Sequence, residues 1–179
     1  MKQQILALLW VGITSTSLAT EQISNVLPHM RFASTVKAEL IFDKIKAMPA
    51  FVNVSKDNHG ASLTLRVSHG YRTSAGGAAA GATTGLLAAT TLGIIPIVKS
   101  HDLVVTYEIL ANDTVIDTIE FRKGFTDAVN LFSEAAQAGK MSKDEEAWLI
   151  GTLPEFELAM SKSEKVKTLV DEYSYYFST

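Results

Sequence analysis

The chain has 179 residues, 16 lysine and arginine residues against 19 aspartate and glutamate residues, a formal net charge of -3 and no cysteine. This length is enough for one domain with a hydrophobic core. The absence of a basic excess argues against a nucleic-acid partner. With no cysteine, the sequence offers no disulfide, no thiolate metal ligand, no cysteine nucleophile and no cysteine for a lipid anchor.

Residues 1–19 have the three parts of a secretory signal peptide. Lys2 supplies the positive start, residues 5–13 form a short apolar core, and Ser17-Leu18-Ala19 supplies the small residues before a cleavage site. An uncleaved N-terminal anchor and an ordinary buried helix are the alternatives. We expect residues 1–19 to be removed and the mature chain to be exported across one membrane.

Residues 20–33 carry little pattern and contain Pro28, so we expect a flexible lead-in. From residue 34 to residue 179 we expect one domain. Its first element is a helix capped by Ser34 and ended by Pro49. The apolar positions of this helix follow one face: Val36, Leu40, Ile41, Ile45 and Met48.

Three later segments have the alternation of half-buried strands. The first is residues 62–71, after a short possible strand at residues 51–54. The other two, residues 103–110 and 115–122, flank a turn of composition Ala-Asn-Asp-Thr and predict a β-hairpin.

The C-terminal third changes to a helical period. Thr126 can cap a helix that runs to Ala138 and ends at Gly139. Ser142 and Glu145 have the spacing of a capping box, which predicts a short helix ended by Gly151. A last helix is expected from Pro154 onward. The order of elements predicts an α+β fold, with a small and largely antiparallel sheet of about four strands packed with helices.

Residues 73–98 form an uncharged Gly/Ala-rich apolar insertion between two of these strands. Arg72 and Lys99 bound it, and glycines recur at every fourth position: Gly77, Gly81 and Gly85. Such a row lies along one helix face and lets another backbone approach closely. The sequence alone leaves three arrangements open: a transmembrane helix, a hairpin-like insertion that returns to the same sheet, or a segment buried in the domain.

Motifs for chemistry are missing from this sequence. It has no H-E-x-x-H or other histidine pair of metal-binding spacing, no G-x-S-x-G and no phosphate-loop ending, so we expect no enzyme, metal site or cofactor. His69 and His101 flank the apolar insertion, and a metal-binding or pH-sensing pair is conceivable if they meet. We interpret the acidic run from Asp144 to Glu146 as helix N-terminal charge.

Residues 62–121 combine a strand, an apolar stretch ending Thr91-Leu92-Gly93-Ile94-Ile95-Pro96, and a strand pair. This combination, behind a signal peptide, resembles small uncharacterised exported proteins and lipoproteins of Gram-negative bacteria, whose T-L-G-x-x-P element similarly precedes a strand. The resemblance implies a periplasmic or envelope location and no reaction. The chain lacks the lipobox cysteine that many of them carry, so the apolar insertion is the candidate anchor.

We therefore expect an envelope protein that acts by binding to a membrane or to copies of itself. The glycine row would pack closely, and the remaining contact residues would be Leu86, Leu87, Leu92, Gly93, Ile94, Ile95, Pro96 and Ile97. The alternative is a soluble periplasmic domain that binds an apolar ligand or an envelope partner.

Overall fold

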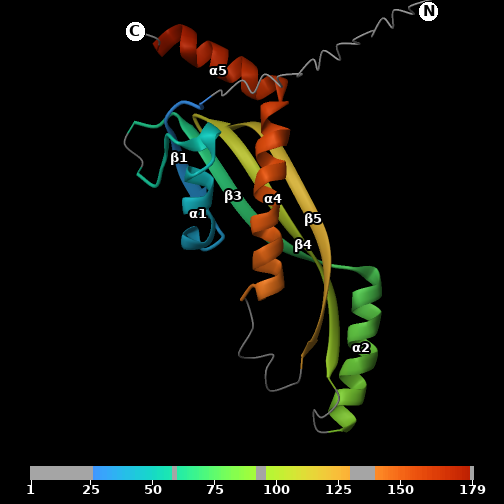
Figure 1. Ribbon diagram of the computed structural model, residues 1–179. Coiled ribbons are helices and arrows are strands. Elements are labelled where there is room, and N and C mark those ends of the chain that lie inside the picture. The colour runs from blue at the N-terminus through green and yellow to red at the C-terminus, as the bar shows by residue number, and fades with distance from the viewer. Residues whose placement is uncertain (1–25, 58–59, 92–95, 130–139, 178–179) are drawn as a thin grey trace, which may run out of the picture.

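The computed structural model describes residues 26–57, 60–91, 96–129 and 140–177. The signal-peptide prediction for residues 1–19 lies outside the described residues. Figure 1 shows the elements, whose bounds are β1 Met30–Ser34, α1 Ala38–Lys46, the 3-10 helix η1 Pro49–Phe51, β2 Val54–Ser55, β3 Leu63–Thr73, α2 Ala75–Thr90, β4 Ile97–Ala111, β5 Thr114–Val129, α4 Lys143–Ser161 and α5 Glu164–Phe177.

The strands form a five-stranded mixed sheet in the order β2-β1-β3-β4-β5. β1 pairs in parallel with both β2 and β3, whereas β3, β4 and β5 pair antiparallel. The fold is therefore α+β, as the sequence predicts. The predicted antiparallel strands at residues 62–71, 103–110 and 115–122 are all present, and each extends further than predicted.

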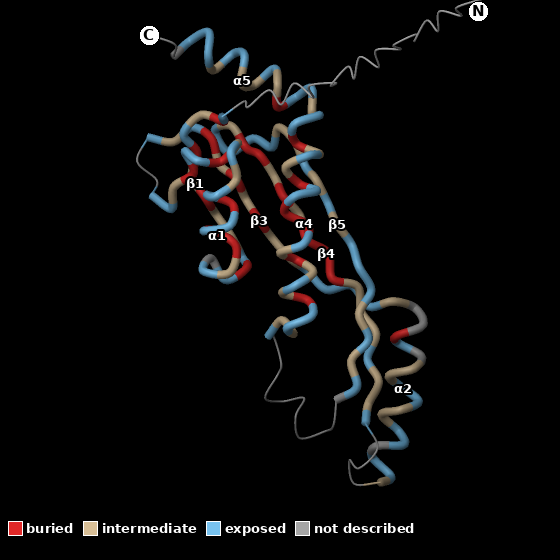
Figure 2. Tube along the Cα trace, in the orientation of Figure 1, coloured by how far each residue is buried: buried red, intermediate tan, exposed pale blue. Residues whose placement is uncertain are grey.

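One face of the sheet carries the core. Leu65, Val67, Val105 and Tyr107, which the predicted alternation places on one face of their strands, are each at most 1% exposed. Helices α1 and α4 lie against this face (Figure 1) and supply Ile41, Ile45, Leu149 and Phe156 among others to the same cluster. Figure 2 shows the buried residues concentrated between the sheet and these helices.

The β4–β5 hairpin turns at Asn112 and Asp113, whose φ angles are +47° and +64°. Two successive residues with positive φ are typical of a type I′ turn, which matches the twist of the flanking strands. Asn and Asp adopt this conformation more readily than most residues. The hairpin is long, and its open end extends past the end of β3 at Thr73, which pairs with His101.

Beyond that point, α2 and the open ends of β4 and β5 form a projection that we call the arm (residues 75–90, 97–100 and 125–129). In Figure 1, α2 lies beside the ends of the two strands, away from α1 and α4. The chain leaves the sheet at β3, runs out through α2 and returns through β4, so all the strands stay in one sheet. No helix among the described residues is long and apolar enough to cross a membrane.

Two N-terminal expectations are wrong. Residues 30–34, predicted within or next to a flexible lead-in spanning 20–33, form β1, which lies between β2 and β3 in the sheet, and Met30 is fully buried. Ser34 belongs to this strand, and its Oγ accepts a hydrogen bond from Val36 N instead of capping a helix. The chain begins α1 only at Ala38.

The predicted helix from Thr126 to Ala138 is also wrong where the structure describes it. Residues 126–129 continue β5, and Thr126 pairs with Ser100 of β4. Residues 130–139 lie outside the described residues. Strand pairing outweighs the local helical spacing because β4 provides backbone partners for these residues, as far as the pair of Ile97 and Val129.

Helix α4 passes through the two residues that were expected to divide it. The capping box of Ser142 and Glu145 is present, but Gly151 does not end the helix and Pro154 lies inside it. The proline is exposed, so the carbonyl that it leaves unpaired can be hydrated. Burial of Leu149, Leu153 and Phe156 on the inner face stabilises the continuous helix.

Candidate functional site

Helix α2 lies against the edge of β4 that β3 has left open. Gly77 is buried there, and a Cβ built on it would meet the carbonyl oxygen of Ser100 at 2.0 Å. At Gly81 the same Cβ would lie 3.7 Å from the carbonyl oxygen of Val98. The first part of the glycine row therefore packs against β4 of the same chain.

A side-chain hydrogen bond completes this contact. The backbone N–H of Val98 donates to Thr84 Oγ1 at 3.1 Å, while the Thr84 hydroxyl donates to the carbonyl of Ala80 at 2.7 Å. Thr84 thus accepts a hydrogen bond from a backbone N–H on the open edge of β4, which would otherwise be free to pair with another strand. The third glycine of the row, Gly85, has nothing within 4 Å of its Cβ direction.

The far end of α2 presents apolar side chains outward. Leu86 is 70% exposed and Leu87 is 48% exposed, and Pro96 is exposed where the chain returns. Ile97 is half-buried. Four other predicted contact residues, Leu92, Gly93, Ile94 and Ile95, lie outside the described residues. Figure 2 shows α2 as mainly intermediate and exposed, in contrast to the body of the fold.

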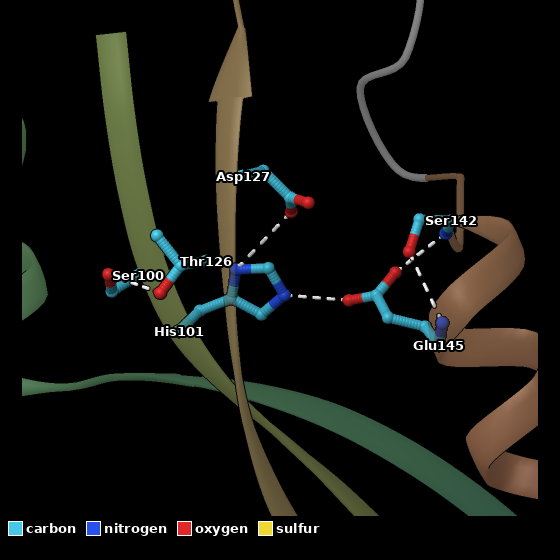
Figure 3. A network of polar contacts seen from close by, with 6 residues as sticks. All are labelled: Ser100, His101, Thr126, Asp127, Ser142 and Glu145. Atoms are coloured by element: carbon cyan, nitrogen blue, oxygen red, sulfur yellow. Dashed lines mark hydrogen bonds and ion pairs between the residues drawn. The ribbon is translucent and has the colours of Figure 1, made fainter.

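At the root of the arm, three ionisable side chains from three elements meet (Figure 3). His101 of β4 lies between Glu145 of α4 and Asp127 of β5. Its Nε2 is 2.6 Å from Glu145 Oε1, and its Nδ1 is 4.0 Å from Asp127 Oδ2. The side chain of Glu145 is only 3% exposed, that of His101 is 22% exposed, and that of Asp127 is 43% exposed.

The capping box holds the Glu145 carboxylate in place. Backbone N–H of Ser142 donates to Glu145 Oε2 at 2.6 Å, and the N–H of Glu145 donates to Ser142 Oγ at 3.3 Å (Figure 3). One carboxylate oxygen is therefore used by the start of α4, and the other faces His101. The interaction predicted from the sequence is correct, but it also positions a buried carboxylate that the sequence did not single out.

Aromatic rings surround the His101 imidazole. Tyr71 lies edge-on to His101 with ring centroids 5.1 Å apart, and edge-on to His69 at 5.8 Å. Tyr71 therefore stands between the two histidines that the sequence suggested as a pair, and His101 meets two carboxylates instead. On the other side Phe125 stacks on His101 at 6.3 Å.

An open depression of about 580 Å³ adjoins this cluster through Phe125. Thr126, Ala147 and Trp148 line it together with four other residues. The Trp148 ring lies edge-on to Phe125, with centroids 5.8 Å apart. The depression therefore brings solvent next to the aromatic side of the His101 cluster.

Tyr71 is expected to ionise at a pH about two units higher than a free tyrosine does. Burial and the negative charges of Glu145 and Asp127 raise the pKa of Tyr71 to about 12, from an ordinary value of 10.0. Because the pKa is raised in the folded protein, the resulting stabilisation is present below pH 10 and is lost as the pH rises toward 12. An ultraviolet difference titration of the wild-type protein against Tyr71→Phe measures the midpoint. A midpoint near pH 10 would contradict the structure.

Sequence reasoning missed most of this cluster for a topological reason. His101 and Glu145 are 44 positions apart, and Asp127 lay in a segment predicted to be helical. The β4–β5 register, which places Phe125 opposite His101, decides the arrangement. The alternation of residues 103–110 and 115–122, extended by a few positions, is the one signal that could have indicated it.

No protein-family model matches this chain, and no curated protein matches it. Among solved structures it is similar to the rare lipoprotein B from Shewanella oneidensis, with a TM-score of 0.37 and 9% identity over 74% of this chain and 95% of that chain. A similarity this low carries no argument about fold or function.

Proposed function

We propose that this protein is an exported envelope protein of a Gram-negative bacterium that attaches to a lipid membrane through the end of its arm and acts by binding, without catalysing a reaction. The observation that carries the proposal is the exposure of Leu86 and Leu87 on an uncharged helix that projects from the body. Export rests on the signal-peptide pattern of residues 1–19.

The packing of α2 favours lipid over a second copy of the chain. The closest approach of the glycine row is made within the chain, because Gly77 already faces Ser100. A second copy that used the same row would have to displace β4. The outward face that remains presents Leu86 and Leu87, and lipid chains accept any apolar surface.

The dimensions fit insertion of the end of the arm, without a crossing of the bilayer. Helix α2 has 16 residues, about 24 Å of helix, which is shorter than the hydrocarbon core of a bilayer. Arg72 and Lys99, both exposed, flank the uncharged stretch at the base of the arm. There they can meet anionic head groups while the apolar end enters the acyl region.

Replacing Leu86 and Leu87 together by glutamate is expected to lower vesicle binding about 100-fold. Burial of one leucine stabilises by roughly 1.5–3 kcal/mol, so loss of two is about 3 kcal/mol or more, and each factor of ten is 1.4 kcal/mol. Flotation of the protein, expressed from the full chain, with vesicles of mixed zwitterionic and anionic phospholipid measures the bound fraction.

The matched control is Leu158→Glu, which changes a leucine on α4 of the body whose exposure, 55%, lies between those of Leu86 and Leu87. This variant should bind vesicles like the wild-type protein. Equal flotation of all three proteins would refute attachment through the arm. A wild-type protein that stays monomeric and does not float would favour the alternative, a soluble periplasmic domain that binds an apolar ligand or an envelope partner.

A further inference from the structure

The cluster at the root of the arm has the make-up of a metal site. His101, Asp127 and Glu145 each offer one ligand atom, and these atoms all lie within 4.8 Å of one another. They come from β4, β5 and α4, so elements distant in sequence converge on one point (Figure 3). We propose that these three side chains bind a divalent transition-metal ion, for which Zn²⁺ is the best-suited probe.

The charge balance of the cluster favours a bound cation. Two carboxylates face one imidazole, and Asp144 and Glu146 add further negative charge in the first turn of α4. A carboxylate as buried as Glu145 is unfavourable unless a positive partner lies beside it. Lys99 is the register partner of Asp127 on β4.

The donor set selects among cations. Imidazole nitrogen and carboxylate oxygen together suit Zn²⁺, whereas Mg²⁺ prefers oxygen ligands in a near-ideal octahedron. Three protein ligands leave at least one position for water, which can enter from the partly exposed Asp127 side. His101 Nε2 and Glu145 Oε1 lie at hydrogen-bond distance, 2.6 Å apart. A metal ion bound to both atoms with bonds of about 2.0–2.2 Å would move them apart by less than about 1 Å. The half-exposed Asp127 carboxylate, which lies 4.0 Å from Nδ1, would turn toward Nε2 to complete the ligand set.

The surroundings of the ligands resemble the outer shell of a metal site. The Ser142 backbone N–H fixes the second oxygen of Glu145 at 2.6 Å, so the first oxygen keeps its direction toward His101. Such outer-shell hydrogen bonds orient ligands and raise metal affinity.

Zn²⁺ is expected to bind with a 1:1 stoichiometry in calorimetry and to raise the melting temperature. At a free concentration 100 times the Kd, the shift is roughly 5–10 °C for a chain of this size. Asp127→Asn, His101→Gln and Glu145→Gln should each weaken binding roughly 10- to 100-fold. Asp127→Asn is the most informative variant, because this side chain is half-exposed and asparagine keeps its size. Glutamine at position 145 can still form the capping box.

Two control variants keep the test specific. His29→Gln removes an exposed histidine, and Asp113→Asn removes an exposed carboxylate in a turn that asparagine tolerates. Both should bind Zn²⁺ like the wild-type protein. The proposal is overturned if wild-type protein shows no saturable Zn²⁺ binding, if Asp127→Asn and His101→Gln bind as tightly as wild type, or if Mg²⁺ binds as tightly as Zn²⁺.

Discussion

Replacing Gly77 by alanine is expected to lower the free energy of unfolding by about 3 kcal/mol and to release α2 from β4. The added Cβ would lie 2.0 Å from the carbonyl oxygen and 2.8 Å from the carbonyl carbon of Ser100. Both atoms are backbone atoms, so no side chain can rotate away, and the helix has to move as a body. Urea unfolding measures the stability, and limited proteolysis within α2 reports its release.

Gly85→Ala is the matched control, because it makes the same change in the same helix where no atom lies within 4 Å. Alanine at this position should stabilise α2 by about 0.5–1 kcal/mol, since alanine is the better helix former. Equal stability of the two variants would mean that α2 does not lie against β4. A large loss for Gly77→Ala alone would support the close helix–strand contact that holds the arm together.

The two variants also bear on membrane attachment. If α2 inserts its leucines into lipid while β4 holds it, then Gly77→Ala should weaken vesicle binding by loosening the helix, although it leaves Leu86 and Leu87 unchanged. Gly85→Ala should not. The glycine row would then hold α2 against β4, and Leu86 and Leu87 would make the contact with lipid.

The local patterns of the sequence predict the antiparallel strands well. Alternation at residues 62–71 and the Asn112-Asp113 turn are properties of short segments, and the structure has both as expected. Strand β1 was missed because it has five residues and depends on parallel partners on both sides. Thr126 and its neighbours have a helical spacing, yet β4 pairs with them as far as Val129. Tertiary pairing overrides local preference in such segments.

The candidate site is likewise only partly predictable from the sequence. The lack of charge in residues 73–98 predicts an apolar insertion between the strands. The spacing of Gly77 and Gly81 predicts a close backbone contact. The partner of that contact, β4 of the same chain, follows only from the topology. The meeting of His101 with Glu145 depends on where α4 begins relative to β4, which no spacing in the sequence encodes.

Phe156→Ala is expected to be the most destabilising single substitution in the body, at about 3–5 kcal/mol. Phe156 is fully buried, stacks on Tyr107 with ring centroids 4.3 Å apart and stacks on Phe51 at 5.4 Å. Its removal leaves a cavity between α4 and the sheet that these rigid rings cannot fill. For a chain of this size the melting temperature should fall by roughly 10 °C or more, measured by differential scanning calorimetry.

Leu158→Ala supplies the comparison on the same helix. Leu158 is 55% exposed, so its replacement should change the free energy of unfolding by less than about 0.5 kcal/mol. The contrast tests whether α4 continues through Gly151 and Pro154, because only a continuous helix places Leu149, Leu153 and Phe156 on one buried face. Similar losses for both variants would mean that the helix breaks at these residues, as local sequence rules predict. A large loss for Phe156→Ala alone means that burial of this face outweighs the proline inside the helix.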